Sequence, residues 1–324
     1  MPSAFVTGGS GFVGRNLIER LRKDGVEVRA IARSEKAKKA VEEAGAKAVP
    51  GDLDDVAAMK AGMAGCETVY HVAAVVELAG DEKRIFEINV TGTANTLQAA
   101  KEASVKAFIN VGAAAVIADG KSLHGVDETY RLPNGPVGIY PRTKALAEKL
   151  VQEANAPGFR TVTLRPPYIW GKGDTSSLDE IIRAVKSRRF AWIGGGKSIL
   201  PTCHVRNLCE ALLLAAEKGK GGEIYFVTDG EQWPARKILT EVLKTQGITP
   251  PDISIPRPLA LGAAYLCEFL WKVLPLPGAP PIVRTMIYLI GTDIAVSDAK
   301  IRRELGFKNV VSMAEGLREM GANS

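Results

Sequence analysis

A tyrosine and a lysine stand four residues apart, at Tyr140 and Lys144, in the segment YPRTK. Residues at this spacing share one face of a helix, so the two side chains would lie together. A free phenol has a pKa of about 10 and is a poor base at neutral pH, but a neighbouring ammonium would lower that value. Such a pair can take a proton from an alcohol or return one to a carbonyl. The spacing is common by chance, so two ordinary helix residues are the alternative.

The chain begins with a strand-like run, a glycine-rich turn and a helix-like run. Ala4–Val6 are apolar, and after the turn apolar residues recur at helical spacing as far as Gly25. Glycines let backbone N–H groups approach a pyrophosphate, and the start of a helix favours its negative charge. The strand and helix on either side disfavour the alternative, a glycine turn without a ligand. The glycines of the turn are Gly8, Gly9, Gly11 and Gly14.

Strand-like and helix-like runs alternate through the first half of the chain. This alternation predicts an α/β fold, with a Rossmann-type doubly wound parallel sheet covered by helices on both faces. The predicted strands are Ala4–Val6, Glu27–Ala32, Lys47–Val49, Thr68–Val72, Ala107–Val111 and Arg160–Arg165, and the helices include Lys36–Ala44, Asp81–Ala103 and Ile139–Asn155. Ligands of such sheets bind beyond the carboxyl ends of the strands. The glycine turn, Arg33, Asp52, His71, Gly112 and Pro166 all stand at such ends.

The second half of the chain differs in composition. Helices are predicted over Leu178–Ser187 and Asn207–Glu217, a further strand over Glu223–Val227, and short polar helices in the tail. Prolines then flank two apolar runs, Leu259–Leu274 and Ile282–Ile290. We interpret the first run as a helix lining an apolar pocket, with a core helix or a peripheral membrane contact as alternatives. The pattern predicts a dinucleotide-binding domain (1–170 plus about 204–230) and a smaller, mostly helical C-terminal substrate lobe (171–203 plus 231–324).

Composition restricts the class of protein. The 324 residues carry a net charge of +6, and the cations are dispersed apart from a group at Arg33, Lys36, Lys38 and Lys39. That distribution favours a local anion site and disfavours a nucleic-acid surface. The four cysteines lie far apart without metal-ligand spacing, and no cleavable signal opens the chain. We therefore expect reduced thiols, no metal site and a cytoplasmic protein.

These motifs occur in the order typical of one superfamily. The chain resembles the extended short-chain dehydrogenases/reductases, within the NAD-dependent epimerase/dehydratase superfamily. It is most similar to their 3β-hydroxysteroid dehydrogenase and dihydroflavonol reductase branch. The resemblance covers most of the chain. Its motifs are highly specific for the superfamily and much less specific for the substrate. Its motifs are Thr7–Gly14, Gly51–Leu53, His71–Ala74, Asn89–Thr93, Tyr140–Lys144, Arg165–Pro166 and His204–Asn207.

The resemblance implies a role for each matching position. Tyr140 would be the acid/base, and Lys144 would hold the nicotinamide ribose and tune Tyr140. Asp52 would bind the adenine amino group, with Leu53 beside the ring. The pyrophosphate would be surrounded by Gly8, Ser10, Gly11, Phe12 and Val13, the riboses would pass Ala73 and Ala74, and the nicotinamide would be bordered by Pro166 and Ile169. By analogy with the family, we also expect a homodimer.

One residue departs from the family pattern. Relatives usually carry a serine or threonine three residues before a valine after the fifth strand, and Ala113 occupies that position here. The hydroxyl normally donates to the substrate oxygen, and losing such a donor costs a factor of about a hundred to a thousand in rate. Asn110, Ser122 or a bound water are candidate replacements. The alternative is a dinucleotide-binding sensor or scaffold with little turnover.

Arg33 bears on the choice of cofactor. An acidic residue after the second strand would hold a ribose 2′-hydroxyl, whereas an arginine suits a 2′-phosphate. Arg33 therefore favours NADP, with NAD as the alternative. A further alternative is that Arg33 belongs to a solvated loop and binds no cofactor. Together these features predict an NAD(P)-dependent oxidoreductase that interconverts a small hydrophobic secondary alcohol and its ketone, steroid-like or flavonoid-like. A nucleotide-sugar epimerase or dehydratase is a further alternative, which the apolar stretch Pro250–Pro281 disfavours.

Overall fold

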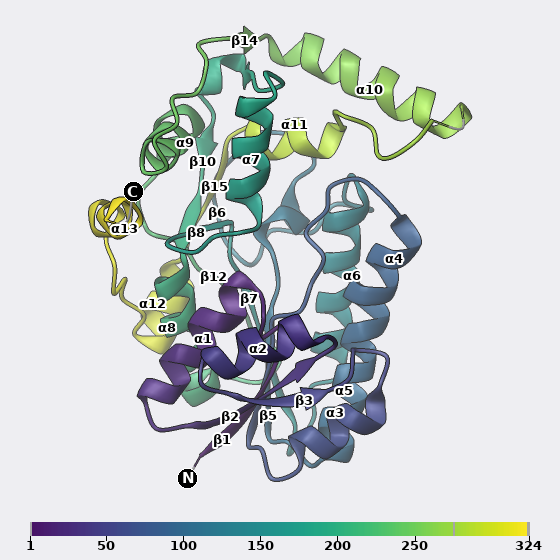
Figure 1. The fold of residues 1–324 in the computed structure, drawn as a ribbon, viewed down its shortest axis with the longest axis vertical. Helices are drawn as coiled ribbons and strands as arrows, with labels where there is room; N and C mark the ends of the chain where they lie inside the picture. Colours follow the sequence, from purple (N-terminus) through teal and green to yellow (C-terminus); the bar gives the residue numbers. More distant parts are fainter. Residues whose placement is uncertain (1, 275, 323–324) are drawn as a thin grey trace.

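A seven-stranded parallel sheet forms the centre of the molecule (Figure 1). The structure, a computed structural model, describes residues 2–274 and 276–322. In spatial order the strands are β12 (Ile224–Phe226), β7 (Arg160–Arg165), β5 (Ala107–Val111), β4 (Thr68–His71), β1 (Ser3–Thr7), β2 (Glu27–Ala32) and β3 (Lys47–Pro50). The order reverses between β1 and β4, which is the point where doubly wound sheets bind ligands. The predicted fold class and all seven predicted strands are confirmed.

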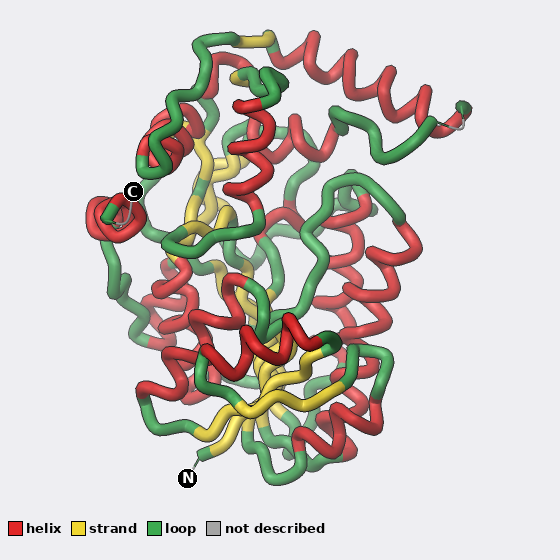
Figure 2. The backbone as a smooth tube through the Cα atoms, in the orientation of Figure 1, coloured by secondary structure: helices red, strands yellow, loops and turns green. Residues whose placement is uncertain are grey.

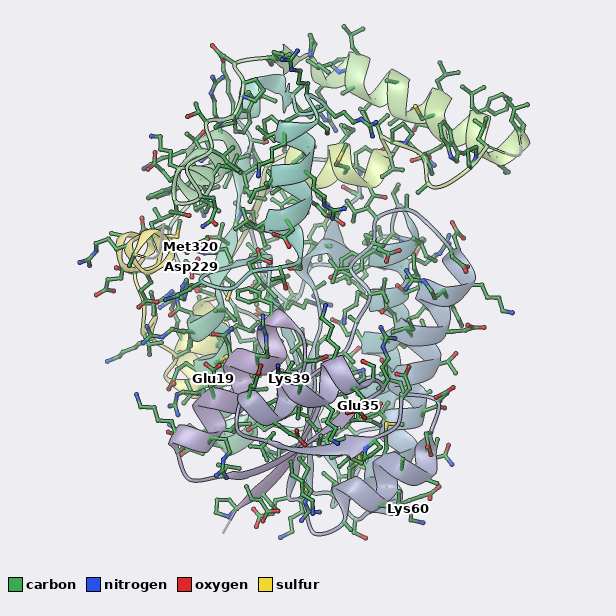
Figure 3. The ribbon with its side chains drawn as sticks, in the orientation of Figure 1. Glu19, Glu35, Lys39, Lys60, Asp229 and Met320 are labelled. Atoms are coloured by element: carbon green, nitrogen blue, oxygen red, sulfur yellow. The ribbon has the colours of Figure 1, made fainter. Side chains whose placement is uncertain are left out.

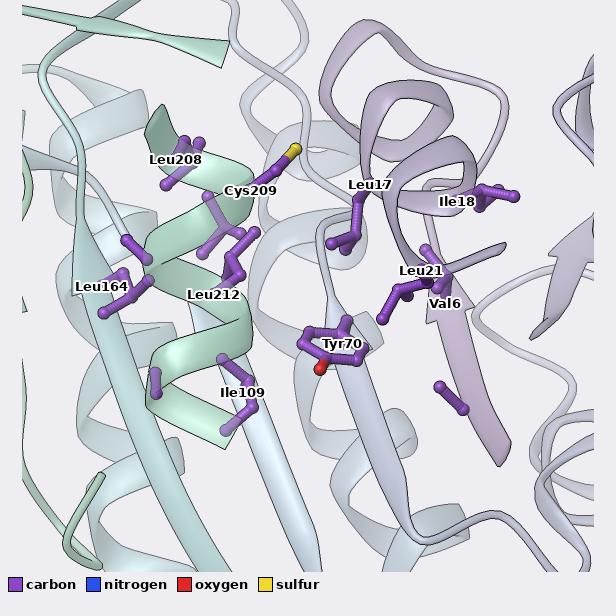
Figure 4. Close-up of a cluster of buried hydrophobic side chains, with 14 of the residues drawn as sticks. Val6, Leu17, Ile18, Leu21, Tyr70, Ile109, Leu164, Leu208, Cys209 and Leu212 are labelled. Carbon is purple, nitrogen blue, oxygen red and sulfur yellow. The ribbon is translucent and has the colours of Figure 1, made fainter. Parts of the chain in front are cut away.

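Helices cover both faces of the sheet because successive strand residues point to opposite sides. On one face, Val6 shares a buried cluster with Leu17 of α1 (Phe12–Lys23) and Leu208 of α8 (Val205–Lys218), all labelled in Figure 4. On the other face, Phe5 belongs to a second buried cluster. That cluster includes side chains from α3 (Val56–Met63), α5 (Gly92–Glu102) and α6 (Ile139–Glu153). The sheet is therefore buried on both sides, and its functional surface is the edge where the strands end.

The segment predicted as one helix over Asp81–Ala103 contains a change of helix type. It is formed by α4 (Glu82–Phe86), a π-helical turn (Glu87–Thr91) and α5. A π-turn inserts extra backbone into a helix and is frequent at functional sites. Here it places Asn89 in a buried position, where it contacts both the loop after β4 and helix α6. The sequence did not signal this turn because its apolar spacing stays helical.

The remaining elements gather mainly beyond the carboxyl ends of the strands (Figures 1 and 2). Short two-stranded pairings join them, such as β8 (Tyr168–Trp170) with β11 (Thr202–His204). Three helices, α3, α9 (Ala235–Lys244) and α11 (Arg284–Ile290), were not predicted. No helix in the described part of the chain is long and apolar enough to cross a membrane. The other helices are α2 (Glu35–Glu43), α7 (Ser177–Lys186), α10 (Arg257–Val273), α11 (Arg284–Ile290), α12 (Ala299–Leu305) and α13 (Met313–Gly321).

The two apolar runs of the second half differ in their surroundings. Helix α10 buries only Ala260 and Ala264 and projects from the molecule, so the interpretation of this run as a core helix is wrong. Helix α11 lies against it and buries Thr285 and Ile287. The second apolar run, Ile282–Ile290, becomes helical at Arg284, and the prolines at 280 and 281 disfavour an earlier start.

Candidate active site

The glycine turn forms a tight cradle between β1 and α1. Gly8 has a φ of +69°, and a Cβ there would lie 2.7 Å from the backbone nitrogen of Ala73. A Cβ on Gly14 would overlap the carbonyl oxygen of Gly8, so only glycine lets α1 pack this closely. Gly11 caps α1 without a side-chain hydrogen bond, and the start of the helix lies at the cavity wall. These features fit a site for a negatively charged phosphate group.

A buried chain of hydrogen bonds fixes the neighbouring strand ends. The Thr7 hydroxyl lies 2.9 Å from Nδ1 of His71, and Nε2 of His71 lies 2.9 Å from the hydroxyl of Thr93. Thr93 donates to the carbonyl of Asn89, so it accepts from His71, and His71 in turn accepts from Thr7. Burial lowers the pKa of His71 to about 3, which keeps the ring neutral. The Thr7 oxygen also accepts from the N–H of Ala73, which holds that backbone against the glycine turn.

Arg33 and Asp52 line the cavity just after β2 and β3, whereas Tyr140 lines it from α6. The guanidinium Nη1 of Arg33 is 3.6 Å from Oδ2 of Asp52, and 63% of the Arg33 side chain is exposed. The second carboxylate oxygen of Asp52 accepts from the N–H of Leu53 at 2.8 Å. Of the basic group predicted here, Lys38 pairs with Glu35 and Lys39 with Glu43 along α2, whose Glu35 and Lys39 Figure 3 shows. Arg33 is thus the cation of this group that borders the cavity.

Tyr140 and Lys144 occupy the first turns of α6, with different surroundings. Tyr140 lines the cavity, and burial raises its pKa to about 12. Lys144 is buried behind it, with Nζ donating to the Val111 carbonyl at 2.7 Å. Burial lowers the pKa of Lys144 to about 8, opposed by the charge of Glu148. We expected Lys144 to lower the pKa of Tyr140. In the protein alone the effect of burial is larger, so the pKa of Tyr140 is raised.

Neighbouring side chains hold α6 in place. Asn89 donates from Nδ2 to the hydroxyl of Thr143 at 3.1 Å and accepts from the N–H of Val75 at 2.8 Å. The π-turn thereby joins the helix of Tyr140 to the loop after β4. On the next turn, Glu148 pairs with Arg165 at the end of β7, both almost fully buried. The orientation of Tyr140 is thus set by contacts from both neighbouring strand ends.

Ala113 lines the cavity, but the expected replacement donors do not. Asn110 is buried in β5 and donates to the hydroxyl of Thr163, and neither it nor Ser122 borders the cavity. The candidate roles of Asn110 and Ser122 are therefore wrong. Sequence reasoning missed Tyr168, which lines the cavity and whose buried hydroxyl has no hydrogen-bond partner among the described residues. Its burial and the nearby Asp174 carboxylate raise the pKa of that hydroxyl.

A single cavity of about 830 Å³ joins the glycine turn to Tyr140 and continues between the upper elements. Its far wall is largely apolar and comes from α7, α11 and the segments around them. Helix α10 contributes nothing to that wall, so its predicted role as the pocket lining is wrong and falls to α11 instead. The predicted site residues on the wall are Gly8, Ser10, Gly11, Phe12, Val13, Arg33, Asp52, Leu53, Ala73, Ala74, Tyr140, Pro166 and Ile169. The far wall includes Ile181, Ala184, Phe190, Ile193, Leu200, Leu239, Met286, Leu289 and Ile290.

The residues present fit a nicotinamide dinucleotide. The glycine cradle accepts a phosphate, and the cavity runs from Arg33 to Tyr140, as an elongated cofactor requires. Within the described residues, no group of three or more His, Cys, Asp and Glu side chains is arranged to hold a metal ion.

Comparison with known proteins agrees with this site. The model of the 3-beta hydroxysteroid dehydrogenase/isomerase family matches residues 5–257. The chain belongs to this family. It is 45% identical to a 4-hydroxy-2-methyl-3-oxo-4-farnesyl-3,4-dihydroquinoline-1-oxide ketoreductase of Stigmatella aurantiaca, over 97% of this chain and 94% of the relative. It is 30% identical to a decarboxylating sterol-4-alpha-carboxylate 3-dehydrogenase of Dictyostelium discoideum, over 99% and 100% of the two chains.

More distant proteins share the fold. A UDP-glucuronic acid 4-epimerase from Bacillus cereus superposes with a TM-score of 0.75 at 18% identity, over 99% of this chain and 98% of the other. At that identity the likeness shows the shared epimerase/dehydratase fold. The 3-beta hydroxysteroid dehydrogenase/isomerase family member described here is thus a dehydrogenase/reductase of the extended short-chain type.

Proposed function

We propose that this family member is an NADP-dependent ketoreductase that interconverts a hydrophobic ketone and its secondary alcohol. The observation that carries the proposal is the shared cavity, in which Tyr140 lies between the glycine cradle and a largely apolar wall. A relative with 45% identity is named for reduction of a ketone that bears a farnesyl group. An apolar wall favours substrates of that kind because burying apolar surface contributes about 25 cal/mol per Å².

Each residue of the site has a definable task. Gly8, Gly11 and the start of α1 would hold the pyrophosphate, and the dinucleotide supplies the hydride when bound. Tyr140 carries the proton to or from the substrate oxygen, because its hydroxyl borders the cavity as a neutral donor. Lys144 supports the ribose side of the site from its buried position beneath Tyr140.

Arg33 supports NADP in place of NAD. Its guanidinium extends at the cavity edge beside the start of α2, where the added 2′-phosphate of NADP would find a cation and a helix N-terminus. The adjacent carboxylate of Asp52 is turned toward the N–H of Leu53 through one oxygen and toward Arg33 through the other.

The far wall disfavours a nucleotide-sugar substrate. A diphosphate needs several cations or N–H donors, whereas Arg189 is the cation of this wall among the described residues and Glu180 lies on the same wall. A sensor or scaffold with little turnover is the remaining alternative, supported by the lack of a hydroxyl at Ala113.

The Tyr140→Phe variant tests the proposal. Its turnover of a panel of apolar ketones is measured by the absorbance of the nicotinamide, with NADPH and with NADH, and compared with that of the wild type. Turnover should fall by at least about a hundredfold, because the proton carrier is removed. Binding of NADPH should change little, since the ring remains. Wild-type turnover in Tyr140→Phe on a good substrate would show that another group moves the proton. The absence of turnover across the whole panel, with tight NADPH binding, would favour the sensor.

A further inference from the structure

A second, smaller cavity lies beside the first turns of α1. Its volume is about 310 Å³, and among the described residues it shares no lining residue with the larger cavity. Its walls come from α1, the segment after β8, the end of β11 with the start of α8, and α13 (Figure 1). Small-molecule sites have volumes of about 300–1,000 Å³, so this cavity can hold a small ligand. The charged and titratable residues on its walls are Arg15, Glu19, Lys172, His204, Arg206 and Glu319.

His204 supplies a buried hydrogen-bond donor without a partner. Only 1% of this residue is exposed. Its Nδ1 accepts from the backbone N–H of Arg206 at 3.3 Å, so the proton of the neutral ring is on Nε2. Burial lowers the pKa of His204, which favours that neutral form. Nε2 has no hydrogen-bond partner among the described residues. Because an unpaired buried donor is costly, a ligand atom that accepts from it would be favourable.

The surroundings of Nε2 place this donor at the boundary of the cavity. A Cβ on Gly171 or on Gly316 would lie 3.0 Å from Nε2 of His204. The atom therefore lies between the segment after β8 and helix α13. Both of these elements continue into the cavity wall, through Lys172 on one side and through Glu319, about one turn after Gly316, on the other.

Arg15 supplies a second buried donor without a partner. It follows Gly14 on α1 and lines the second cavity. Its Nε is buried and has no hydrogen-bond partner among the described residues. Its Nη2 lies 3.4 Å from the carbonyl oxygen of Gly173, so the guanidinium is turned toward the segment after β8. Two unpaired N–H donors, from α1 and from the end of β11, therefore belong to the walls of one cavity.

The charges on these walls favour an anion. The cations are Arg15, Lys172 and Arg206, and the carboxylates are those of Glu19 and Glu319. The carboxylate of Glu319 lies 2.6 Å from Nη1 of Arg206, so these two charges compensate each other. Helix α8, which is 14 residues long, begins at the same cavity and adds the positive end of its dipole. The described walls therefore keep an excess of positive charge.

We propose that the second cavity binds a phosphate group, either as inorganic phosphate or as the phosphate monoester of a small molecule. The oxygens of a phosphate point in tetrahedral directions, so they can accept from donors on separate walls, as Arg15 and His204 require. A carboxylate has only two oxygens, and they lie in one plane. Val13 and Gly14 line the larger cavity, whereas Arg15 lines the second one. A dinucleotide and the phosphate ligand can therefore be bound at the same time.

Isothermal titration calorimetry of the full chain tests the proposal. The protein is first saturated with NADPH or NADH, whichever binds more tightly, so that the glycine cradle is filled. It is then titrated with inorganic phosphate, glycerol 3-phosphate or acetate at constant ionic strength. At least one of the two phosphates should bind to one site, and acetate should bind at least about tenfold more weakly than that phosphate. Tighter binding of glycerol 3-phosphate would identify a monoester as the ligand, and tighter binding of inorganic phosphate would identify the free ion.

Two arginines of α1 provide the variant and its matched control. Arg15→Gln should raise the Kd of the phosphate by at least about tenfold, as the loss of a charge-assisted hydrogen bond predicts. Arg22→Gln changes an exposed arginine of the same helix that lines neither cavity, so it should bind the phosphate like the wild type. If Arg15→Gln melts early, Arg206→Gln replaces it, because about half of the Arg206 side chain is exposed.

Four results would overturn the proposal. They are a wild-type protein that binds neither phosphate, acetate that binds as tightly as phosphate, an unchanged Kd in the arginine variant, and phosphate binding that the dinucleotide abolishes. The last result would show that phosphate occupies the glycine cradle. The titration requires no turnover, so its outcome is independent of whether the protein reduces a ketone.

Discussion

The proposed preference for NADP rests on the charge of Arg33. Its guanidinium is well exposed at the cavity edge and lies 3.6 Å from the Asp52 carboxylate. Replacing it by alanine removes the charge partner of a 2′-phosphate and leaves the rest of the site unchanged. Arg33→Ala should raise the Kd of NADPH by about tenfold or more, as the loss of a charge-assisted hydrogen bond predicts, and change that of NADH much less. Fluorescence titration with both cofactors measures the difference. An equal loss of affinity for NADPH and NADH would show that Arg33 does not contact the 2′-phosphate.

Ala113 is the residue at which the site departs most from its family. Neither Asn110 nor Ser122 reaches the cavity, so a second donor to the developing oxyanion is missing at this position. Ala113→Ser should therefore increase kcat on a good ketone by about tenfold, with little change in cofactor affinity. Ala115→Ser, which adds a hydroxyl to the same wall, is the matched control. An unchanged or lower kcat in Ala113→Ser would show that another group, such as the Tyr168 hydroxyl, already serves as donor.

At the scale of elements, the ends of β1 and β4 depend on a neutral histidine. The pKa of His71 is about 3 in the fold, against an ordinary 6.5. Between these values the unfolded chain binds a proton that the folded chain does not, so stability falls as pH falls from about 6.5. The free energy of unfolding should decrease by up to about 1.4 kcal/mol per pH unit from this residue.

Chemical denaturation across that pH range, compared with His71→Gln, isolates the effect. The variant should be less stable at neutral pH, because the Thr7–His71–Thr93 chain is lost, but its stability should depend less on pH. The gap between the two proteins should therefore narrow on acidification. A constant gap would mean that His71 does not remain neutral in the folded protein.

The sequence predicted the elements that local patterns determine. The glycine turn, the seven strands and the helix carrying Tyr140 each follow from residue spacing and turn chemistry. The π-turn at Glu87–Thr91 does not, because one inserted residue leaves the apolar spacing nearly helical. Asn110 was misplaced because closeness in sequence was used, whereas the alternation of side chains along β5 directs it toward Thr163.

At the scale of the whole molecule, the sequence also did not predict that α10 is exposed. The mostly apolar sequence of the 17-residue helix α10 indicates a helix that avoids water, but the elements it packs against depend on how the later parts of the chain fold. Here α11 lies between α10 and the cavity. The pocket is therefore lined by α11, although α10 was expected to line it, and α10 packs on the other side of α11. The same division predicts two separate responses to a bound substrate, protection in α11 and little change in α10.

Hydrogen exchange distinguishes these responses. With NADPH and an apolar ketone in solution, protection should increase in α11 and α7, because Met286, Leu289, Ile181 and Ala184 line the cavity. Exchange in α10 should change little, since its buried side touches α11 and not the ligand. Protection confined to the glycine turn and the end of β4 would contradict an apolar substrate, because the far wall would then remain unused while the cofactor is bound.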